Sequence, residues 1–259
     1  MDSDTSLRPY TFRAADSRLI CHETNSFGLF SRMNKRKVIT IDGLAGSGKS
    51  SIASQLAQRL GFVHFNSGLL YRAVAHLVSQ HGVSVDDEDA ITKLIKSHRI
   101  ELRWRSGVGA QLIIDEVVID ATQVSTPALS EITSQVSKHF KVREALLEMQ
   151  RVAFAGHDLV AEGRDMGTVV FPAADLKFFV QADVAVRIER RMAQLALKSG
   201  NPAISKVDMQ KEILERDQRD SARAVSPTIA ASDAILIDNS SGSLNEVVEK
   251  IYQRALQKT

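Results

Sequence analysis

A glycine-rich segment near the start of the chain restricts the fold more than any other feature. Residues 43–50 read Gly-Leu-Ala-Gly-Ser-Gly-Lys-Ser, which matches the phosphate-loop pattern G-x-x-x-x-G-K-[ST]. The apolar stretch 38–42 precedes this segment as an expected strand, and the amphipathic stretch 49–60 follows it as an expected helix. Since this strand-loop-helix context is the one in which the pattern binds phosphate, the segment predicts a nucleotide site.

Each part of this loop has a physical task. Glycines allow the backbone to wrap so that N–H groups and the positive end of the helix dipole face a β-phosphate. Lys49 would bridge the β- and γ-phosphates of ATP, Ser50 would ligate Mg²⁺, and Ser51 would reach the α-phosphate. The residues expected to contact ATP are Gly43, Leu44, Ala45, Gly46, Ser47, Gly48, Lys49, Ser50 and Ser51.

Strand and helix patterns alternate along most of the remaining chain. Further buried strands are expected at 62–65, 159–162, 176–180 and 234–237. Helical patterns lie near 69–81, 142–155, 183–198, 207–222 and 244–257. This alternation predicts an α/β fold in which helices flank a parallel sheet of the P-loop NTPase type.

The alternation of strand and helix patterns is interrupted between residues 97 and 138. Short antiparallel strands are expected at 100–104 and within 112–119, with turns at 106–109 and 115–116, and a helix is expected after Pro127. The segment therefore predicts a small inserted lobe of antiparallel strands and a helix, between core segments 37–96 and 139–259. A surface excursion with no role in binding is the alternative.

Composition excludes several classes of partner and location. Lys and Arg number 33 against 31 acidic residues, a balance that argues against nucleic acid as a partner. Cys21 is the only cysteine, so no intrachain disulfide can form and a reducing compartment is expected. No apolar stretch approaches the roughly 18 residues of a membrane span, and no signal peptide opens the chain. We expect a cytoplasmic protein, monomeric and without membrane contact.

Residues 1–36 lack the periodicity of the rest and are treated as an N-terminal extension. A misassigned start codon, with a compact protein beginning near Met33, and a real flexible extension both remain open. An organelle transit peptide is disfavoured because acidic residues interrupt the extension.

The phosphate loop alone does not choose the reaction. The Asn-Lys-x-Asp motif that a regulatory GTPase would carry downstream of the loop is absent from the sequence, and only residues 159–162 come near the acidic strand end of a motor ATPase. A small-molecule kinase is the class that remains.

Five further motifs identify a family resemblance. Together with the loop, and in the same order along residues 37–256, they resemble bacterial cytidylate kinase. They are residues 66–72 (Asn-Ser-Gly-Leu-Leu-Tyr-Arg), 134–136 (Ser-Gln-Val), 142–147 (Val-Arg-Glu-Ala-Leu-Leu), 162–172 (Glu-Gly-Arg-Asp-Met-Gly-Thr-Val-Val-Phe-Pro) and 215–223 (Glu-Arg-Asp-Gln-Arg-Asp-Ser-Ala-Arg).

The resemblance implies phosphoryl transfer from ATP to CMP or dCMP, with the insert as the acceptor-binding lobe, and a role for each matching residue. The acceptor phosphate would be held by Ser67, Arg72, Arg164 and Arg223. The cytosine edge would be read by Ser134, Arg143 and Asp165, and the sugar hydroxyls by Arg216 and Asp220. The chemistry agrees, because a carboxylate complements the N4 amino group of cytosine and repels O4 of uracil.

Several of these residues have plainer interpretations when taken singly. The cluster at 216–223 lies on a predicted helix, where its spacing is also typical of solvated ion pairs. Tyr71 could be a wall of the acceptor pocket or a core residue. Glu162, a candidate for the water shell of Mg²⁺, stands where the family often has Asp, Asn66 also departs from the family, and Ser125 replaces an arginine of the insert.

A mobile lid near 187–202 is also expected. Its candidate cations Arg187, Arg190 and Arg191 lie at helical spacing, with 198–202 as a flexible tip, and an ordinary basic surface helix is the alternative. Lys49, Arg164, Arg223, Arg187 and Arg191 are thus the predicted catalytic cations. A kinase of another acceptor, such as UMP, AMP or shikimate, and a non-catalytic nucleotide-binding module remain as rivals.

Overall fold

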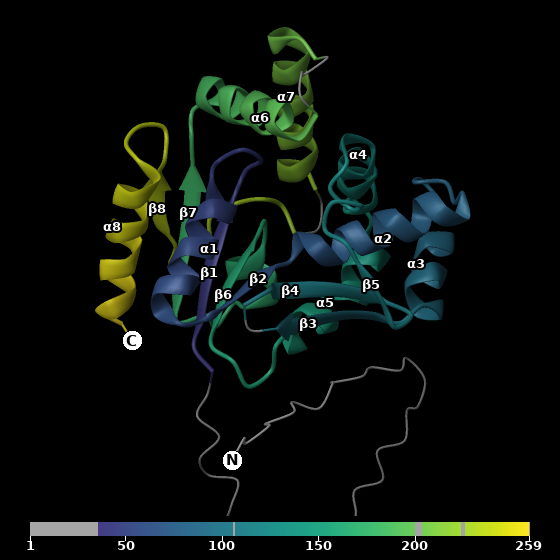
Figure 1. The fold of residues 1–259 in the computed structure, drawn as a ribbon, viewed down its shortest axis with the longest axis horizontal. Helices are drawn as coiled ribbons and strands as arrows, with labels where there is room; N and C mark the ends of the chain where they lie inside the picture. The colour runs from purple at the N-terminus through teal and green to yellow at the C-terminus, as the bar shows by residue number, and fades with distance from the viewer. Residues whose placement is uncertain (1–35, 106, 200–203, 224–225, 259) are drawn as a thin grey trace, which may run out of the picture.

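A five-stranded parallel sheet forms the centre of the molecule (Figure 1). The computed structural model describes residues 36–105, 107–199, 204–223 and 226–258. The strands are β1 (Val38–Gly43), β2 (Val63–Asn66), β6 (Leu159–Gly163), β7 (Leu176–Gln181) and β8 (Ile235–Asp238), in the order β2-β6-β1-β7-β8. All pairs are parallel, which confirms the predicted fold class.

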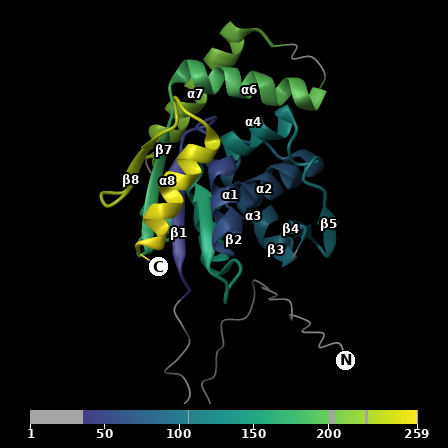
Figure 2. The same ribbon diagram turned by 60° about the vertical axis from the view of Figure 1, so that its left-hand side comes forward.

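Helices cover both faces of this sheet, so its central strands read as continuous apolar runs. On one face α1 (Lys49–Leu60) and α8 (Leu244–Leu256) pack together, with Ile52, Leu56 and Ile251 fully buried. On the other face lie α2 (Gly68–His81), α3 (Glu88–Ser97) and α5 (Phe140–Val152). Figure 2 shows α2 and α3 beside each other. None of the described helices has both the length and the apolar composition needed to cross a bilayer.

The segment 97–138 forms the expected small antiparallel unit. Its strands are β3 (Ile100–Arg105), β4 (Gly109–Ile114) and β5 (Val117–Ile119), followed by α4 (Pro127–Val136). Asp115 and Glu116 both have positive φ, as a tight two-residue hairpin turn requires. Its buried apolar side chains belong to the same cluster as Phe65 of β2, so the unit is packed firmly onto the sheet layer.

Two elements were missed by the sequence patterns. Helix α3 is short and polar, although Asp87 caps its first turn and Ile91 and Ile95 bury one face at i,i+4 spacing. The π-helical turn η2 (Met166–Val170) directly follows the Gly163-Arg164-Asp165 segment. The other predicted helices and strands are present, with boundaries shifted by a few residues at most.

The carboxyl ends of the parallel strands meet at one edge of the sheet, where open α/β sheets bind ligands. Helices α6 (Val184–Ser199) and α7 (Lys206–Ser221) lie above this edge and pack against each other through Ile188, Met209 and Ile213 (Figure 1). The predicted lid tip reaches residues 200–202, which lie outside the described residues, as does the extension up to residue 35.

Candidate functional site

The phosphate loop leaves the carboxyl end of β1 and enters α1 with the geometry its glycines allow. Gly43 has φ +154°, and a Cβ there would lie 2.3 Å from the Val180 carbonyl oxygen. Gly48 has φ +89°, and a Cβ there would lie 2.4 Å from Nδ2 of Asn239. Both positions therefore exclude a side chain, for conformational and steric reasons.

Asn239, directly after β8, holds the loop from the strand two positions away from β1 in the sheet. Its buried side-chain amide donates to the Ser47 carbonyl at 2.7 Å, and its backbone N–H donates to the Gln181 carbonyl at 2.8 Å. No sequence motif singled out this residue. A polar residue directly after a buried strand, at the edge where the loop lies, was the available signal.

Replacing Asn239 with alanine should weaken binding of an ATP analogue about tenfold, because the loop carbonyl loses a buried hydrogen-bond donor. The measurement is a titration with a fluorescent ATP analogue. Ser240→Ala is the matched control, since that hydroxyl accepts from the Asp183 N–H on the exposed side of the same segment. Equal affinity for the Asn239 variant and the wild type would contradict a role in shaping the loop.

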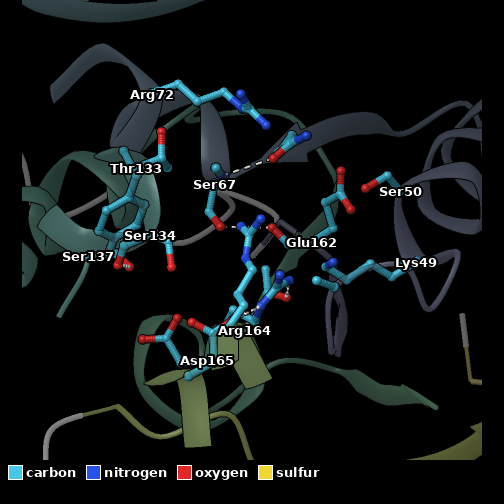
Figure 3. A pocket seen from close by; sticks show the side chains of 18 of the residues that line it. Lys49, Ser50, Ser67, Arg72, Thr133, Ser134, Ser137, Glu162, Arg164 and Asp165 are labelled. Carbon is cyan, nitrogen blue, oxygen red and sulfur yellow. Dashed lines mark hydrogen bonds and ion pairs between the residues drawn. The ribbon is translucent and has the colours of Figure 1, made fainter. Parts of the chain in front are cut away.

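One cavity of about 360 Å³ joins this loop to the predicted acceptor groups (Figure 3). In Figure 3, Lys49 and Glu162 lie on one side, Ser134 and Ser137 on the other, and Arg164 between them. The cavity brings together most of the predicted site residues: Ala45, Gly46, Gly48, Lys49, Ser50, Ser51, Ser67, Tyr71, Arg72, Ser134, Arg143, Glu162, Arg164, Asp165, Arg191, Arg216, Asp220 and Arg223. Gly43, Leu44, Ser47 and Arg187 do not line it.

Lys49 occupies the floor of this cavity as a buried cation. Its Nζ lies 3.4 Å from the Leu44 carbonyl oxygen, and the residue is 9% exposed. Burial, with a contribution from Arg164, lowers the pKa of Lys49 to about 7, whereas Glu162 opposes the shift. A triphosphate beside the amine would favour its charged form.

Asp220 links two arginines on the acceptor side. Its buried carboxylate accepts from Nε of Arg164 at 2.9 Å and from Nη2 of Arg223. Burial would raise the pKa of Asp220, but Arg164, Arg223 and Arg216 together lower it. Burial lowers the pKa of Arg216 to about 10, with a further contribution from Arg164. The cluster carries more positive than negative charge, which suits an anionic ligand.

Arg143 of α5 and Asp165 form a second buried pair. Nη2 of Arg143 donates to Asp165, its Nη1 donates to the Ser137 carbonyl at 3.1 Å, and its guanidinium lies 5.3 Å from the centre of the Tyr71 ring. Ser134 Oγ and Arg143 Nε are buried without a hydrogen-bond partner among the described residues. Unpaired polar atoms around a buried carboxylate fit a polar ligand edge.

Tyr71 fits both interpretations, because it packs in the apolar cluster and also lines the cavity. Arg72 reaches across to the inserted segment, where its Nη1 donates to the Val124 carbonyl at 2.6 Å and contacts Ser130 Oγ at 3.4 Å. Thr133, Ser137 and Gln194 also line the cavity and had not been predicted.

Among the charged residues at 216–223, Arg219 is the one that fits the interpretation as a solvated ion pair. Arg219 forms an exposed pair with Glu131 of α4, at 2.7 Å. Arg216, Asp220 and Arg223 instead line the cavity. Helical spacing could not separate these cases, because it says which residues share a face but not what covers that face.

The predicted lid cations lie in different places. Arg191 lines the cavity. Arg187 is 2% exposed and is held by Asp217 at 2.6 Å and by the carbonyl oxygens of Ala45 and Ala182. Arg187 therefore links α6 and α7 to the phosphate loop, and its buried charge is satisfied by the carboxylate and the two carbonyl oxygens.

Glu162 is the candidate for a metal at this edge. It is 1% exposed, and its Oε1 lies 3.2 Å from Nε2 of His64, a residue the sequence had not pointed to. Burial would raise the pKa of Glu162, but His64, Lys49 and Ser50 lower it. Its Oε2 is buried without a partner at regular hydrogen-bond geometry among the described residues. A free carboxylate oxygen next to the Ser50 hydroxyl fits a hard cation such as Mg²⁺.

Comparisons with known proteins agree on one family. The model of the family described as cytidylate kinase matches residues 39–257. The chain is 41% identical over 219 residues to a protein of Solibacter usitatus named cytidylate kinase, covering 85% of this chain and 92% of the relative. It is 38% identical to a cytidylate kinase of Marinomonas sp., covering 85% of this chain and 96% of the relative.

A longer relative matches over part of its length. The chain is 40% identical over 232 residues to a bifunctional pantoate ligase/cytidylate kinase of Trichormus variabilis. The match covers 87% of this chain but only 43% of that relative, so the chain spans less than half of the bifunctional protein.

Proposed function

Because this chain belongs to the cytidylate kinase family, we propose that it transfers the γ-phosphoryl group of ATP to CMP or dCMP. The products are ADP and CDP or dCDP. One observation carries the proposal: a single cavity holds Lys49 of the phosphate loop and the buried Arg164–Asp220–Arg223 cluster. Two anionic ligands, one on each side, would meet inside it.

The reaction needs alignment and charge neutralisation more than a base. A phosphate oxygen of the monophosphate is already anionic, so it attacks the γ-phosphorus directly while the bond to the β–γ bridging oxygen breaks and ADP leaves. Lys49 faces the donor phosphates and Arg164 stands between donor and acceptor, so both stabilise charge on the transferring group. Arg191 also lines the cavity and would add positive charge as a cation of the proposed lid.

A metal ion completes the donor side. Ser50 and Glu162 are the residues that would hold Mg²⁺. When bound, the ion neutralises the charge of the β- and γ-phosphates. Among the described residues no group of three His, Cys, Asp or Glu side chains could hold a metal alone, which suits an ion that arrives with its nucleotide.

The acceptor would lie with its phosphate against Ser67, Arg72, Arg164 and Arg223. Its sugar would meet Arg216 and Asp220, and its base would meet Ser134, Arg143 and Asp165. Residues 97–138 would form the acceptor lobe and residues near 187–202 the lid, on the core 37–96 and 139–259. We also propose a cytoplasmic monomer.

Asp165→Asn should lower the ratio of kcat/KM for CMP to that for UMP about tenfold or more, because a site built to accept from N4–H₂ loses its carboxylate. The measurement is steady-state kinetics with each acceptor. Asp217→Asn is the control, since Asp217 pairs with Arg187 outside the cavity. A ratio unchanged by Asp165→Asn would contradict its role in reading the base.

The proposed function itself is tested by ATP-dependent turnover of the purified chain across CMP, dCMP, UMP, dUMP and AMP. CMP and dCMP should give the highest kcat/KM. Preference for UMP or AMP would favour a kinase of another acceptor, and no turnover of any monophosphate would favour a non-catalytic nucleotide-binding module.

A further inference from the structure

A carboxylate that faces away from both ligand positions lies between the two halves of the site. Asp42 is the last residue before the phosphate loop and pairs in register with Gly163 of the neighbouring strand β6. It is 3% exposed and does not line the cavity. Burying a carboxylate is costly unless hydrogen bonds compensate, so a role for this residue is expected.

Both oxygens of Asp42 bind backbone N–H groups of one turn. Oδ1 accepts from Met166 N–H at 2.9 Å, and Oδ2 accepts from Gly167 N–H at 2.8 Å. These two residues open η2 and directly follow Arg164 and Asp165. Asp42 thus caps the turn that carries one phosphate-binding and one base-reading side chain.

The same turn is closely packed against its neighbours. A Cβ at Gly163 would lie 2.7 Å from Ser67 Oγ, and a Cβ at Gly167 would lie 2.9 Å from Thr40 Oγ1. Thr40 of β1 therefore lies against the turn, and Ser67 lies against the end of β6 that leads into it. A small displacement of the turn would move both Arg164 and Asp165 relative to the acceptor.

We infer that Asp42 is a positioning residue for acceptor recognition, which holds Arg164 and Asp165 in register with the phosphate loop by capping the turn at Met166 and Gly167. The inference rests on the proposed function, since it names the acceptor side as the part that Asp42 controls. Because Asp42 is contiguous with the loop at Gly43, the same strand end sets the position of donor and acceptor groups together.

The charge state of Asp42 suits this role. Burial raises the pKa of Asp42 to about 6, and the N–H groups of Gly167 and Met166 oppose that shift. Asp165 raises this pKa as well and Arg164 lowers it. Above about pH 6 the carboxylate is ionised and can accept both hydrogen bonds at full strength.

Asp42→Asn tests the inference, because the asparagine side chain has nearly the same shape as that of aspartate. The amide keeps one acceptor oxygen but turns an NH₂ group toward one of the two N–H donors. We expect KM for CMP to rise about tenfold and the CMP to UMP ratio of kcat/KM to fall about tenfold, the effect of losing one charged hydrogen bond. KM for ATP should stay within about twofold of the wild type.

Asp175→Asn is the matched control. Its carboxylate accepts from the Val38 N–H at 2.8 Å, at the opposite end of β1 and away from the cavity. We expect Asp175→Asn to keep the KM for CMP and the CMP to UMP ratio of kcat/KM. If a variant only loses folded protein, its apparent kcat falls for every substrate, but its KM and this ratio do not change. Gly167→Ala, whose Cβ would lie 2.9 Å from Thr40 Oγ1 and so push the turn away from β1, should give the Asp42→Asn result and serves if that variant does not fold.

Hydrogen exchange gives a readout that needs no substrate. Without nucleotide, the peptide covering residues 163–170 should exchange faster in Asp42→Asn than in the wild type, and in Asp175→Asn it should not. If the wild type phosphorylates CMP but Asp42→Asn and Gly167→Ala both keep its KM and its CMP to UMP ratio, the inference is wrong. If the wild type does not phosphorylate CMP, the proposed function is wrong instead. Unchanged hydrogen exchange in residues 163–170 of Asp42→Asn would by itself refute the capping of this turn by Asp42.

Discussion

Lys49→Ala is expected to lower kcat about 100- to 1000-fold, the range seen when one preorganised donor to a developing negative charge is removed. Lys49 lies inside the cavity, and its Nζ contacts only the Leu44 carbonyl among the hydrogen bonds of the described residues. Without a phosphate this amine is a buried cation whose pKa burial lowers to about 7. The charge of Lys49 is therefore positioned to bind a ligand and contributes little to the stability of the fold.

The same reasoning predicts that the Lys49→Ala variant stays folded. Removing a buried charge that lacks a close ion pair should leave the free energy of unfolding unchanged or raise it. Steady-state kinetics with ATP and CMP measure the first effect, and thermal unfolding without nucleotide measures the second. Lys138→Ala, which removes an exposed lysine paired with Asp86, is the control. Turnover of Lys49→Ala near that of this control would contradict the assignment of the loop.

Arg223→Ala is expected to lower kcat/KM for CMP about 100-fold, because truncating one partner of a buried, hydrogen-bonded charge cluster costs several kcal/mol. Nη2 of Arg223 binds Asp220 and also donates to Ser137 Oγ at 3.0 Å, so it links the segment after α7 to the end of α4. Its loss removes one cation from the acceptor phosphate and leaves Asp220 with Arg164.

Arg219→Ala is a matched control for this prediction. Arg219 is one helical turn away and also reaches α4, but its pair with Glu131 is exposed, and such pairs contribute about 0–1 kcal/mol. We expect Arg219→Ala to keep kcat/KM within about threefold of the wild type. Similar losses in both variants would mean that docking of α7 on α4, and not a charge at the acceptor, controls activity.

The donor side of the site could be predicted from sequence because it is local. Residues 38–60 contain the strand, the loop and the helix in one stretch, and the backbone of that stretch determines where Lys49 and Ser50 lie. The helix was predicted with its observed ends, since Gly48 and Gly61 stand at its two caps in left-handed conformations.

The acceptor side could be predicted only through the joint motif pattern. Arg143, Arg164 and Arg223 come from three separate segments, and no periodicity in one segment says that they meet. Asn239, His64 and Asp42 were missed for the same reason: each acts on a residue far away in sequence. Arg187 and Arg191 lie on one helix at i,i+4 spacing, yet one is buried against Asp217 and the other lines the cavity, a difference set by tertiary packing.

The central claim is that one cavity holds a triphosphate and a cytidine monophosphate so that a phosphoryl group passes between them. Phosphorus NMR of the purified chain with ATP, Mg²⁺ and CMP tests it most directly. The γ-phosphate signal of ATP and the CMP signal should decline together while CDP and ADP appear in equal amounts. Release of inorganic phosphate with CMP unchanged, or no change in either nucleotide, would contradict it.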